Sequence, residues 1–526
     1  MDAKPPAHSR FSAAAADWWF VLCWGFCLGI ALIQAGRNRS FWLDEAYLYG
    51  NLLQKTPWEI IFGGPLLHFQ QCPKIFLAVT DVLTGWLGPG RFWPRFLPLL
   101  FQLAGIGLWL EFYRETFWKN NKSLPAFMAA AALLVSSSYT LYYTYEFKPY
   151  AADFFFTGAA FYLFSSSLPP ARRLRLLAAL LPLSLLFSYP AAFSVAAVAL
   201  ALAFDPGERK EAAGEKSWLL ASAAAVLLAG VFNYFTDYRF GLAGDASDPI
   251  RKYWERFFIT GPGAQDYFLN FLRHSQDLVL NWWRTDQGPM NEHFARVARI
   301  PFLPLPALNW PAVRLLAFLL VLLEFLGAAF KVIRGKARRE ELLLVLFVAV
   351  MLAAAVLRLY PYGHSRLTLF FLPLSAFLLV SSFSRLHRRL PYLIVWLPLF
   401  AVAARNALFL GLCFARAPYV EDAGPALKEI YTTRAKFLVA AKGNSLMLAG
   451  ERLPPDLVVL YEDTLGAENI IRAIGRNNFY YAWSHALPER SPGGTVKAYE
   501  NAYVERPVLR QPDGLVAGLV ILSPRR

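Results

Sequence analysis

The sequence predicts a polytopic α-helical membrane protein with a small α/β domain at its C-terminal end. Of its 526 residues, 56% are hydrophobic, and they gather in runs of about twenty, the length that an α-helix needs to cross a bilayer. Lysine and arginine fall in short loops between these runs, in a chain whose net charge is +15. In membrane proteins such loops set the orientation, so nucleic-acid binding is not expected.

We expect about 11 transmembrane helices from the lengths of the apolar runs. The first run follows a short, weakly basic N-terminus and is too long and too aromatic for a cleaved signal peptide, so it is expected to be retained. The run 174–204 would be on the order of 46 Å long as one helix, which predicts two helices joined at 188–190. The expected spans lie near 17–36, 92–112, 123–141, 149–167, 174–204 (two spans), 217–235, 311–331, 341–358, 366–383 and 391–412.

Basic residues indicate the orientation. With the N-terminus in the cytoplasm, the inner loops hold arginine and lysine clusters such as 172–175 and 385–389, and the short outer loops hold far fewer. Counting 174–204 as one span would reverse this pattern. Two outer pieces are expected to lie at the membrane surface: NLLQKTPWEIIF, with Trp58 as an anchor, and KIFLAVTDVLTGWL, which carries Asp81 in its middle.

We divide the chain into a transmembrane domain, residues 1–412, with outer loops 37–90 and 236–310, and an extracytoplasmic α/β domain, residues 413–526. In the second domain the strand-like segments SLMLAG, DLVVLY, NFYYAW and GLVAGLVIL accompany the helix-like segment AENIIRAIGR. Of the four cysteines, Cys23 and Cys27 are expected to pack inside the first span. Cys72 and Cys413 could both face outward, and the sequence leaves open whether they pair.

Chemically capable side chains gather in the loops that this topology places on the outer face. The first loop contains FWLDEAYLYG, the second TYEFKPYAAD, and the third RLYPYGHSR. Carboxylates and cations at the depth of the lipid headgroups are costly unless they serve a function there. The candidates are Asp44 and Glu45 in the first loop, Glu146, Lys148 and Tyr150 in the second, and Tyr360, His364 and Arg366 in the third. The second loop also offers Asp153, to which no role is given.

Each candidate also has a simpler interpretation. Asp44 is a fair N-cap for the helix that follows it, and Glu146 could merely pair with Lys148. Lys148 and Arg366 could extend their charged ends to the interface from the ends of spans. His364 could be an ordinary loop histidine. The gathering of carboxylates and cations on one face favours a functional site.

From Asp44 onward the motifs resemble those of the GT-C glycosyltransferases, and among them the glycosyltransferase family 39 group, which includes protein O-mannosyltransferases and bacterial aminoarabinose transferases of lipid A. LDEAY resembles their acidic motif. FQQCPKIF and GPGRFWPRFLPLL resemble the loop and second span of bacterial members, with Lys74 in place of a frequent second proline. YEFKPYAAD resembles a Glu-x-Arg-x-Tyr-like element in which Lys148 replaces the arginine, and YPYGHSRLTLFFLP resembles a late Tyr-Pro…Arg…Pro element.

This resemblance implies a GT-C-like fold and transfer of a sugar, with inversion, from a polyprenyl-phosphate donor to a lipid, glycan or protein hydroxyl on the outer face of the inner membrane. Asp44 resembles the family's base, and Glu45 or Glu146 would orient the acceptor or bind the sugar. Planar guanidinium suits a leaving phosphate, so Arg366 and then Lys148 are its expected ligands. The expected substrate-binding residues also include Tyr150, Tyr360 and His364. No cofactor is implied, although Asp44, Glu45 and Glu146 could hold a divalent cation.

The alternative function is a polytopic protein without chemistry, either a transporter or flippase of the carrier lipid or an assembly factor. Transporters place ionisable residues near the bilayer midplane, where this chain has little beyond Glu324 and Arg405, to which no role is given. The loop 236–310 is expected to form a lid or acceptor platform, or to anchor the interface. Its aromatic candidates are Tyr253, Trp254, Tyr267, Trp282 and Trp283.

Overall fold

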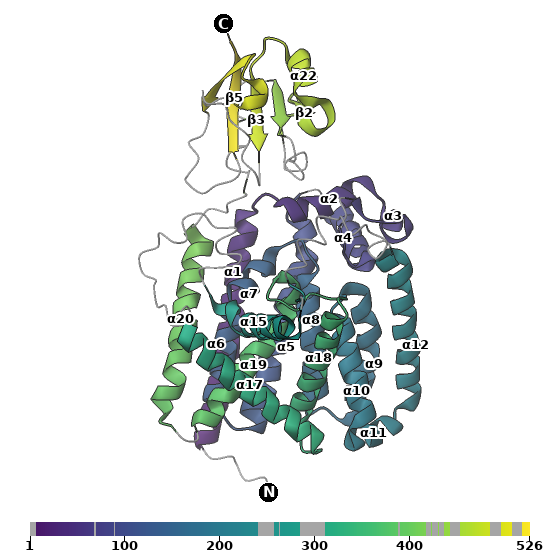
Figure 1. Ribbon diagram of the computed structural model, residues 1–526, viewed down its shortest axis with the longest axis vertical. Helices are drawn as coiled ribbons and strands as arrows, with labels where there is room; N and C mark the ends of the chain where they lie inside the picture. The colour runs from purple at the N-terminus through teal and green to yellow at the C-terminus, as the bar shows by residue number, and fades with distance from the viewer. Residues whose placement is uncertain are drawn as a thin grey trace.

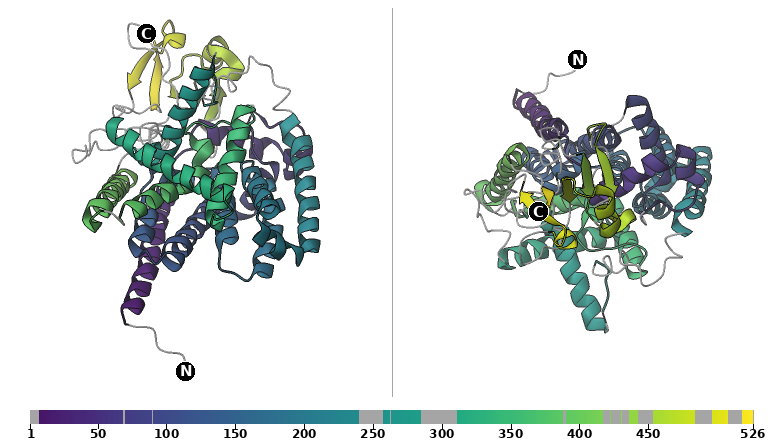
Figure 2. Two further views of the ribbon diagram at one scale, coloured as in Figure 1. Left: turned by 60° about the horizontal axis from the view of Figure 1, so that its bottom comes forward. Right: turned by 90° about the horizontal axis from the view of Figure 1, so that it is seen from above.

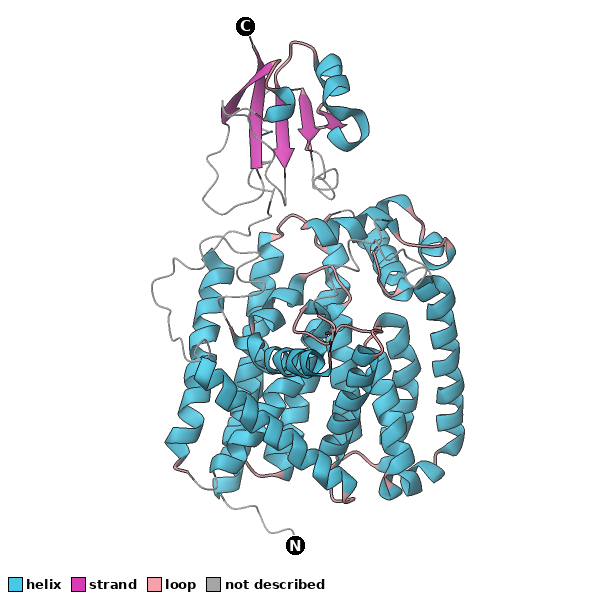
Figure 3. Ribbon diagram, in the orientation of Figure 1, coloured by secondary structure: helices cyan, strands magenta, loops and turns pink. Residues whose placement is uncertain are grey.

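A bundle of long helices forms the body of the protein, and a small sheet with helix α22 lies beyond one end of it (Figures 1 and 3). The N-terminus lies at the opposite end of the bundle (Figure 1). Seen from the sheet side, the strands lie over the helices (Figure 2). This computed structural model describes residues 7–67, 70–88, 90–239, 257–261, 263–284, 311–387, 390–416, 422, 430, 436–441, 453–483, 496–507 and 518–525.

Long helices follow the apolar runs, because a helix satisfies its backbone polar groups internally where lipid offers no partner. The helices at the ranges expected for spans are α1 (Ala7–Arg37), α5 (Phe96–Tyr113), α6 (Leu124–Val135), α8 (Tyr150–Ser165), α9 (Pro170–Phe187), α10 (Ala191–Phe204), α12 (Lys216–Asn233), α17 (Pro311–Ile333), α18 (Arg339–Val356), α19 (Leu372–His387) and α20 (Tyr392–Arg416). Further helices lie between them: α2 (Leu43–Gln54), α3 (Pro57–Phe62), α4 (Lys74–Leu87), α7 (Ser138–Tyr142), α11 (Pro206–Ala213) and α15 (Ala264–Leu280).

Six of the described helices are long and apolar enough to cross a membrane, or up to eight if each of two bent pairs is one span. Helices α8 and α10 have only 16 and 14 residues, and α9 begins with a cluster of arginines. The chain is therefore a multi-pass membrane protein, and the count of about eleven spans stays a prediction. The break in the run 174–204 is confirmed, since α9 ends at Phe187 and α10 begins at Ala191.

The end of the bundle that faces the sheet carries α2, α3 and α4 (Figure 1), and we call it the outer end. Helix α3 begins at a capping box in which Thr56 and Glu59 exchange hydrogen bonds. Its Trp58 is 69% exposed, as expected of an interfacial anchor. The opposite end, which carries α11, is called the inner end.

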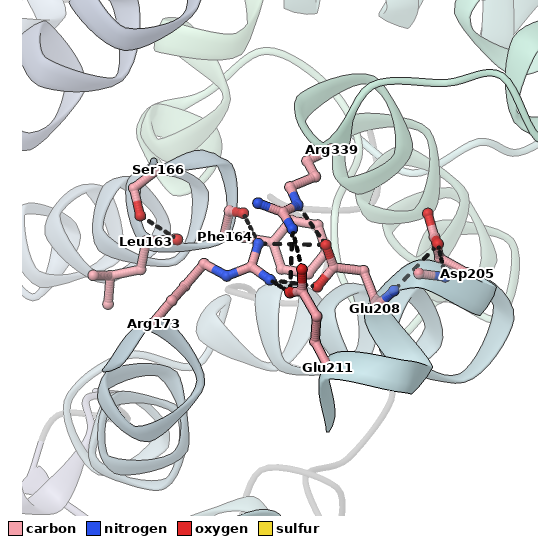
Figure 4. Close-up of polar contacts among 9 residues, drawn as sticks. Leu163, Phe164, Ser166, Arg173, Asp205, Glu208, Glu211 and Arg339 are labelled. Carbon is pink, nitrogen blue, oxygen red and sulfur yellow. Dashed lines mark hydrogen bonds and ion pairs between the residues drawn. The ribbon is translucent and has the colours of Figure 1, made fainter. Parts of the chain in front are cut away.

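A cluster of buried ion pairs ties three helices together at the inner end (Figure 4). The guanidinium of Arg173 on α9 contacts the carboxylates of Glu208, at 2.8 Å, and Glu211 on α11. Arg339 on α18 contacts the same two carboxylates at 2.5 and 2.9 Å. Arg173 and Glu208 are buried, so water does not solvate their charges. Each is stabilised instead by the opposite charges of the cluster.

Helices α5 and α8 pack closely against each other in the core of the bundle. A Cβ atom on Gly105 would lie 2.8 Å from the Phe154 ring, and one on Gly158 would lie 2.8 Å from the Trp109 indole. Small residues at a helix contact let the two backbones approach, and van der Waals packing then holds the helices together in lipid. The Trp109 indole also donates to the carbonyl oxygen of Phe154, at 3.1 Å.

The C-terminal part forms a mixed five-stranded sheet of order β2-β1-β3-β5-β4, in which β1 is parallel to both its neighbours. Its elements are β1 (Phe437–Ala440), β2 (Val458–Tyr461), α22 (Glu462–Ile474), β3 (Phe479–Trp483), β4 (Tyr503–Pro507) and β5 (Gly518–Pro524). The strands expected at DLVVLY, NFYYAW and the end of GLVAGLVIL are present, as is the expected helix. SLMLAG lies outside the described residues, and β1 and β4 were not expected.

All four cysteines are free thiols and are buried. Cys72 lies in the core that includes α2 and α4, and Cys413 packs in the main helical core. The disulfide that the sequence left open between them is therefore absent.

Candidate active site

The acidic pair lies in the first turn of α2, at the outer end of the bundle. The helix begins at Leu43 with Trp42 as its N-cap residue, so the interpretation of Asp44 as the N-cap is wrong. The carboxylate of Glu45 instead turns back and accepts from the backbone N–H of Trp42, at 3.3 Å. Both acids are favoured at this position by the positive end of the helix dipole.

Glu45 is fully buried and its carboxylate is surrounded by hydrogen-bond donors. Arg95 donates from Nε and Nη2 to its two oxygens, at 2.7 Å each, and Arg39 donates to Oε2 at 2.7 Å. The backbone N–H of Phe147 donates to Oε1 at 2.8 Å. Burial opposes ionisation, but Arg39 and Arg95 outweigh it and lower the pKa of Glu45. Glu45 thus holds the loops of the site together.

Asp44 points to the cations that the sequence suggested for phosphate binding. Its Oδ2 lies 2.5 Å from Nη2 of Arg366 and 3.9 Å from Nζ of Lys148. Asp44 is 21% exposed and Arg366 is 20% exposed, so both remain accessible to a ligand. Lys148 is buried and donates to the amide oxygen of Gln70 at 2.9 Å. Burial lowers the pKa of Lys148, and Asp44 opposes that shift.

Trp42 connects this group to Glu146. Its indole N–H donates to Oε1 of Glu146 at 3.0 Å, and the guanidinium of Arg366 lies 4.9 Å from the centre of its ring. Within the described part of the chain, Oε2 of Glu146 is buried and has no hydrogen-bond partner. Burial, and then the charge of Glu45, raises the pKa of Glu146. The simple pair of Glu146 with Lys148 is not formed, since Lys148 turns to Gln70 and Asp44.

The remaining candidates differ in what they can offer a ligand. Tyr150 is buried beside the pair of Asp44 and Arg366, with its ring against Tyr143 at 5.4 Å. The hydroxyl of Tyr360 already donates to the carbonyl oxygen of Leu367, at 2.7 Å. That bond holds the third outer loop to the start of η9 (Arg366–Phe371).

His364 is held among aromatic rings. Its ring lies 4.2 Å from Trp282 and 4.9 Å from Tyr139. Burial, with Arg284 and Arg314 nearby, lowers the pKa of His364 to about 3. At neutral pH the imidazole is therefore uncharged, and it adds no cation to the site.

A second polar group adjoins the site. The sequence placed its Asp153 in the second outer loop without giving it a role, and it missed Asp237. Asp237 lies on the π-helical turn η5 (Tyr234–Tyr238) after α12, and its carboxylate accepts from the hydroxyl of Tyr189 at the α9–α10 junction. Asp153 on α8 is hydrogen-bonded to Ser188 at the same junction. Within the described ranges, Oδ1 of Asp153 is buried without a partner. The charges of Lys148, Asp237 and Asp153 all act on the thiol of Cys72, so the two groups are neighbours.

Two signals in the sequence could have pointed to this second group. Asp153 is an acid inside an apolar run, and Asp237 stands directly after another apolar run. Ionisable residues in such places are functional candidates by default. Their meeting depends on how α8, α9 and α12 pack, which the runs do not encode.

The three-carboxylate metal site is not formed. Glu45 is occupied by Arg39 and Arg95, so it cannot join Asp44 and Glu146 as a ligand. In the part of the chain that the structure describes, no three His, Cys, Asp or Glu side chains lie together in a way that could hold a metal ion. The donor set present at the site, one carboxylate between two cations, suits an anion better than a cation.

The expectation of a lid from 236–310 is wrong for Trp282 and Trp283. Trp282 and Trp283 are buried in the helical core, where their indoles donate to the carbonyl oxygens of Leu278 and Leu133. Tyr267 packs on the same core from α15, and Tyr253 and Trp254 lie outside the described residues. Sequence alone could not separate these aromatic residues from interfacial ones, because both favour a partly apolar setting.

The two charges inside spans have separate local partners. Glu324 on α17 pairs with Arg385 at 2.9 Å, and Arg405 donates to the side chain of Asn406 at 3.1 Å. Neither contact reaches the outer-end site.

The sequence matches no protein-family model and no curated protein. The structure is similar to the crystal structure of ArnT from Cupriavidus metallidurans in the apo state, with 12% sequence identity and a TM-score of 0.47. It is also similar to the crystal structure of the same protein bound to undecaprenyl phosphate, with 13% identity and a TM-score of 0.45. Both matches cover 96% of this chain and 98% of the ArnT chain. It is also similar to the archaeal oligosaccharyltransferase AglB from Archaeoglobus fulgidus in complex with an inhibitory peptide and a dolichol-phosphate (12% identity, 89% and 69% coverage, TM-score 0.42). These are GT-C glycosyltransferases, the superfamily that the motifs resemble.

Proposed function

We propose that the chain is a membrane glycosyltransferase that moves a sugar from a polyprenyl-phosphate carrier to a hydroxyl of a lipid, glycan or protein. The observation that carries the proposal is the contact of Asp44 with Arg366 and Lys148 at the outer end of the bundle. A carboxylate that can take a proton, beside cations that can take a leaving phosphate, is what glycosyl transfer from a phosphate requires.

In the proposed step the acceptor oxygen bonds to the anomeric carbon while the bond from that carbon to the phosphate oxygen breaks. The electron pair stays on the phosphate, where Arg366 and Lys148 neutralise it, and the acceptor proton passes to Asp44. The cations act mainly on charge that develops as the bond breaks, which is where stabilisation raises the rate. Glu45 is sealed by its arginines, so it cannot attack the sugar as a nucleophile. In the proposed step a single displacement by the acceptor inverts the anomeric carbon.

We infer that the sugar extends from the phosphate cations toward Asp153 and Asp237. Sugar hydroxyls are hydrogen-bond donors, and carboxylates are their strongest acceptors among side chains. Asp153 has a buried oxygen available in the described structure, and the charges of Lys148, Asp153 and Asp237 all act on the thiol of Cys72. Glu146, with its own buried free oxygen, would contact the sugar or the acceptor from the other side.

This function places the outer end on the extracytoplasmic face of the inner membrane, with the N-terminus in the cytoplasm and the domain at 413–526 in the periplasm. The orientation is supported by basic residues at the inner end, such as Arg172 and Arg175 in the first turns of α9 and Lys336 between α17 and α18.

The test is sugar transfer by the purified protein in detergent from a panel of polyprenyl-phosphate sugars, with wild type beside Asp44→Asn. We expect the variant to lose about 10²–10⁴-fold in turnover while it still binds sugar-free polyprenyl phosphate. Asp81→Asn on α4 is the matched control, because Asp81 is a partly buried acid at the same end, and it should keep full turnover. Unchanged turnover in Asp44→Asn would rule out its role as base. Binding of the carrier without turnover of any donor by wild type would favour a transporter or an assembly factor.

A further inference from the structure

The segment between α1 and α2, residues 38–42, is held from two sides. On one side Arg95 donates to the carbonyl oxygens of Arg39 and Ser40, at 2.8 and 3.1 Å. On the other side the backbone N–H of Ser40 donates to Oδ1 of Asp422, at 2.9 Å. Ser40 is 2% exposed, so the second contact satisfies a buried donor with a charged acceptor, which is a strong form of hydrogen bond.

Asp422 comes from the far end of the chain. It lies in the connection between α20, which ends at Arg416, and the sheet, which begins with β1 at Phe437. A second contact joins the ends of the two helices that precede these segments, since Nη1 of Arg37 at the end of α1 donates to the carbonyl oxygen of Phe414 near the end of α20, at 2.7 Å. The C-terminal part is thereby attached to the loop that carries the acidic pair.

The held segment leads directly to the site. Two residues after Ser40, Trp42 donates to Glu146 and lies under Arg366. Asp44 follows two residues later in the first turn of α2. A backbone shift at Ser40 therefore moves the indole that orients Arg366 and the carboxylate that faces it, and a misplacement of about 1 Å can cost 10²-fold in rate.

We propose that Asp422 is a positioning residue that fixes the loop 38–44 for transfer, so that the connection to the C-terminal domain completes the active site. This rests on the proposed function for its effect on rate. The attachment itself, and its loss on substitution, can be measured without any substrate.

The experiment compares Asp422→Ala and Asp422→Asn in the full chain, with Asp456→Ala as the control, because Asp456 is an exposed acid in the same C-terminal part. Hydrogen exchange by mass spectrometry follows a peptide covering residues 38–43. We expect about tenfold faster exchange in Asp422→Ala, because the Ser40 N–H loses its acceptor. Asp422→Asn keeps the oxygen acceptor and should restore most of the protection, and Asp456→Ala should match wild type.

The kinetic readout separates positioning from general damage. Asp422→Ala should lower kcat roughly tenfold with an unchanged KM for the loaded carrier and unchanged binding of sugar-free polyprenyl phosphate. Wild-type exchange and kcat in Asp422→Ala would overturn the proposal, and so would faster exchange spread evenly over the membrane helices. If wild type transfers no sugar but exchange in 38–43 still rises selectively, the proposed function fails and the attachment stands.

Discussion

Asp44 and Glu45 are adjacent in the sequence, yet their carboxylates belong to different ion-pair networks. Glu45 is fully buried between Arg39 and Arg95, whereas Asp44 is partly exposed and faces Arg366. The helical turn separates the two side chains by about 100°, so one points into the protein and the other toward the ligand side. Glu45 therefore holds the structure together, and Asp44 is available for chemistry.

The two acids should therefore differ in their effect on stability. We expect Glu45→Gln to lower the free energy of unfolding by ~3–5 kcal/mol, because it leaves two buried guanidinium groups without their charge partner. Asp44→Asn should change it by less than ~1 kcal/mol, since its pair is partly solvated. Thermal unfolding in mild detergent measures both, and an equal loss in the two variants would contradict the division of roles.

Arg366 should be required for binding of the carrier phosphate. A guanidinium gives a phosphate two parallel hydrogen bonds that an ammonium cannot. We expect Arg366→Met to weaken binding of sugar-free polyprenyl phosphate about 10–100-fold, and Arg366→Lys to lie between it and wild type. Arg472→Met, which alters an arginine that is 76% exposed on α22, is the control and should bind normally. Wild-type affinity in Arg366→Met would place the phosphate elsewhere.

Asp153 should distinguish a carrier with a sugar from a carrier without one. Asp153→Ala removes a buried oxygen acceptor that is proposed to face the sugar, so the loaded donor should bind about tenfold more weakly. Binding of the sugar-free carrier should not change, because the phosphate cations are intact. Equilibrium binding of both lipids to wild type and variant gives the ratio, and equal losses for the two lipids would argue against a sugar subsite.

His364 should make stability depend on pH in the acid range. Its pKa is lowered to about 3 in the folded protein, while the unfolded chain takes up the proton near its ordinary value of about 6.5. The unfolded state therefore binds more protons between these values, and stability falls as the pH falls, by up to ~1.4 kcal/mol per pH unit. The melting temperature should drop less between pH 7 and pH 5 in His364→Gln than in wild type. An identical fall in the two proteins would mean that His364 takes up its proton when folded.

At the inner end, the buried Arg173 should contribute more to stability than the nearby, exposed Arg175. Arg173→Ala leaves Glu208 buried with only part of its charge partnership, and we expect a loss of ~3–5 kcal/mol in the free energy of unfolding. Arg175 is itself 55% exposed where it pairs with Glu215, so Arg175→Ala should cost less than Arg173→Ala. The two melting temperatures, measured side by side, give the comparison. A larger effect at Arg175 would contradict the arrangement in Figure 4.

The sequence by itself determined where the long helices lie, the break between α9 and α10, and the loops in which the site is found. These features follow from local patterns: the length of apolar runs, proline, and the distribution of basic residues. It also indicated Asp44, Arg366 and Lys148 as candidates, because charges at the ends of apolar runs are conspicuous.

Only the tertiary structure decided which of these groups meet. Glu45 is sealed by Arg95, Asp153 and Asp237 gather at one junction, and Asp422 reaches Ser40 from the far end of the chain. Each contact joins segments that are distant in sequence. Its existence depends on how helices pack against one another, and the periodicity of a single helix records which face is apolar but not which neighbour covers it.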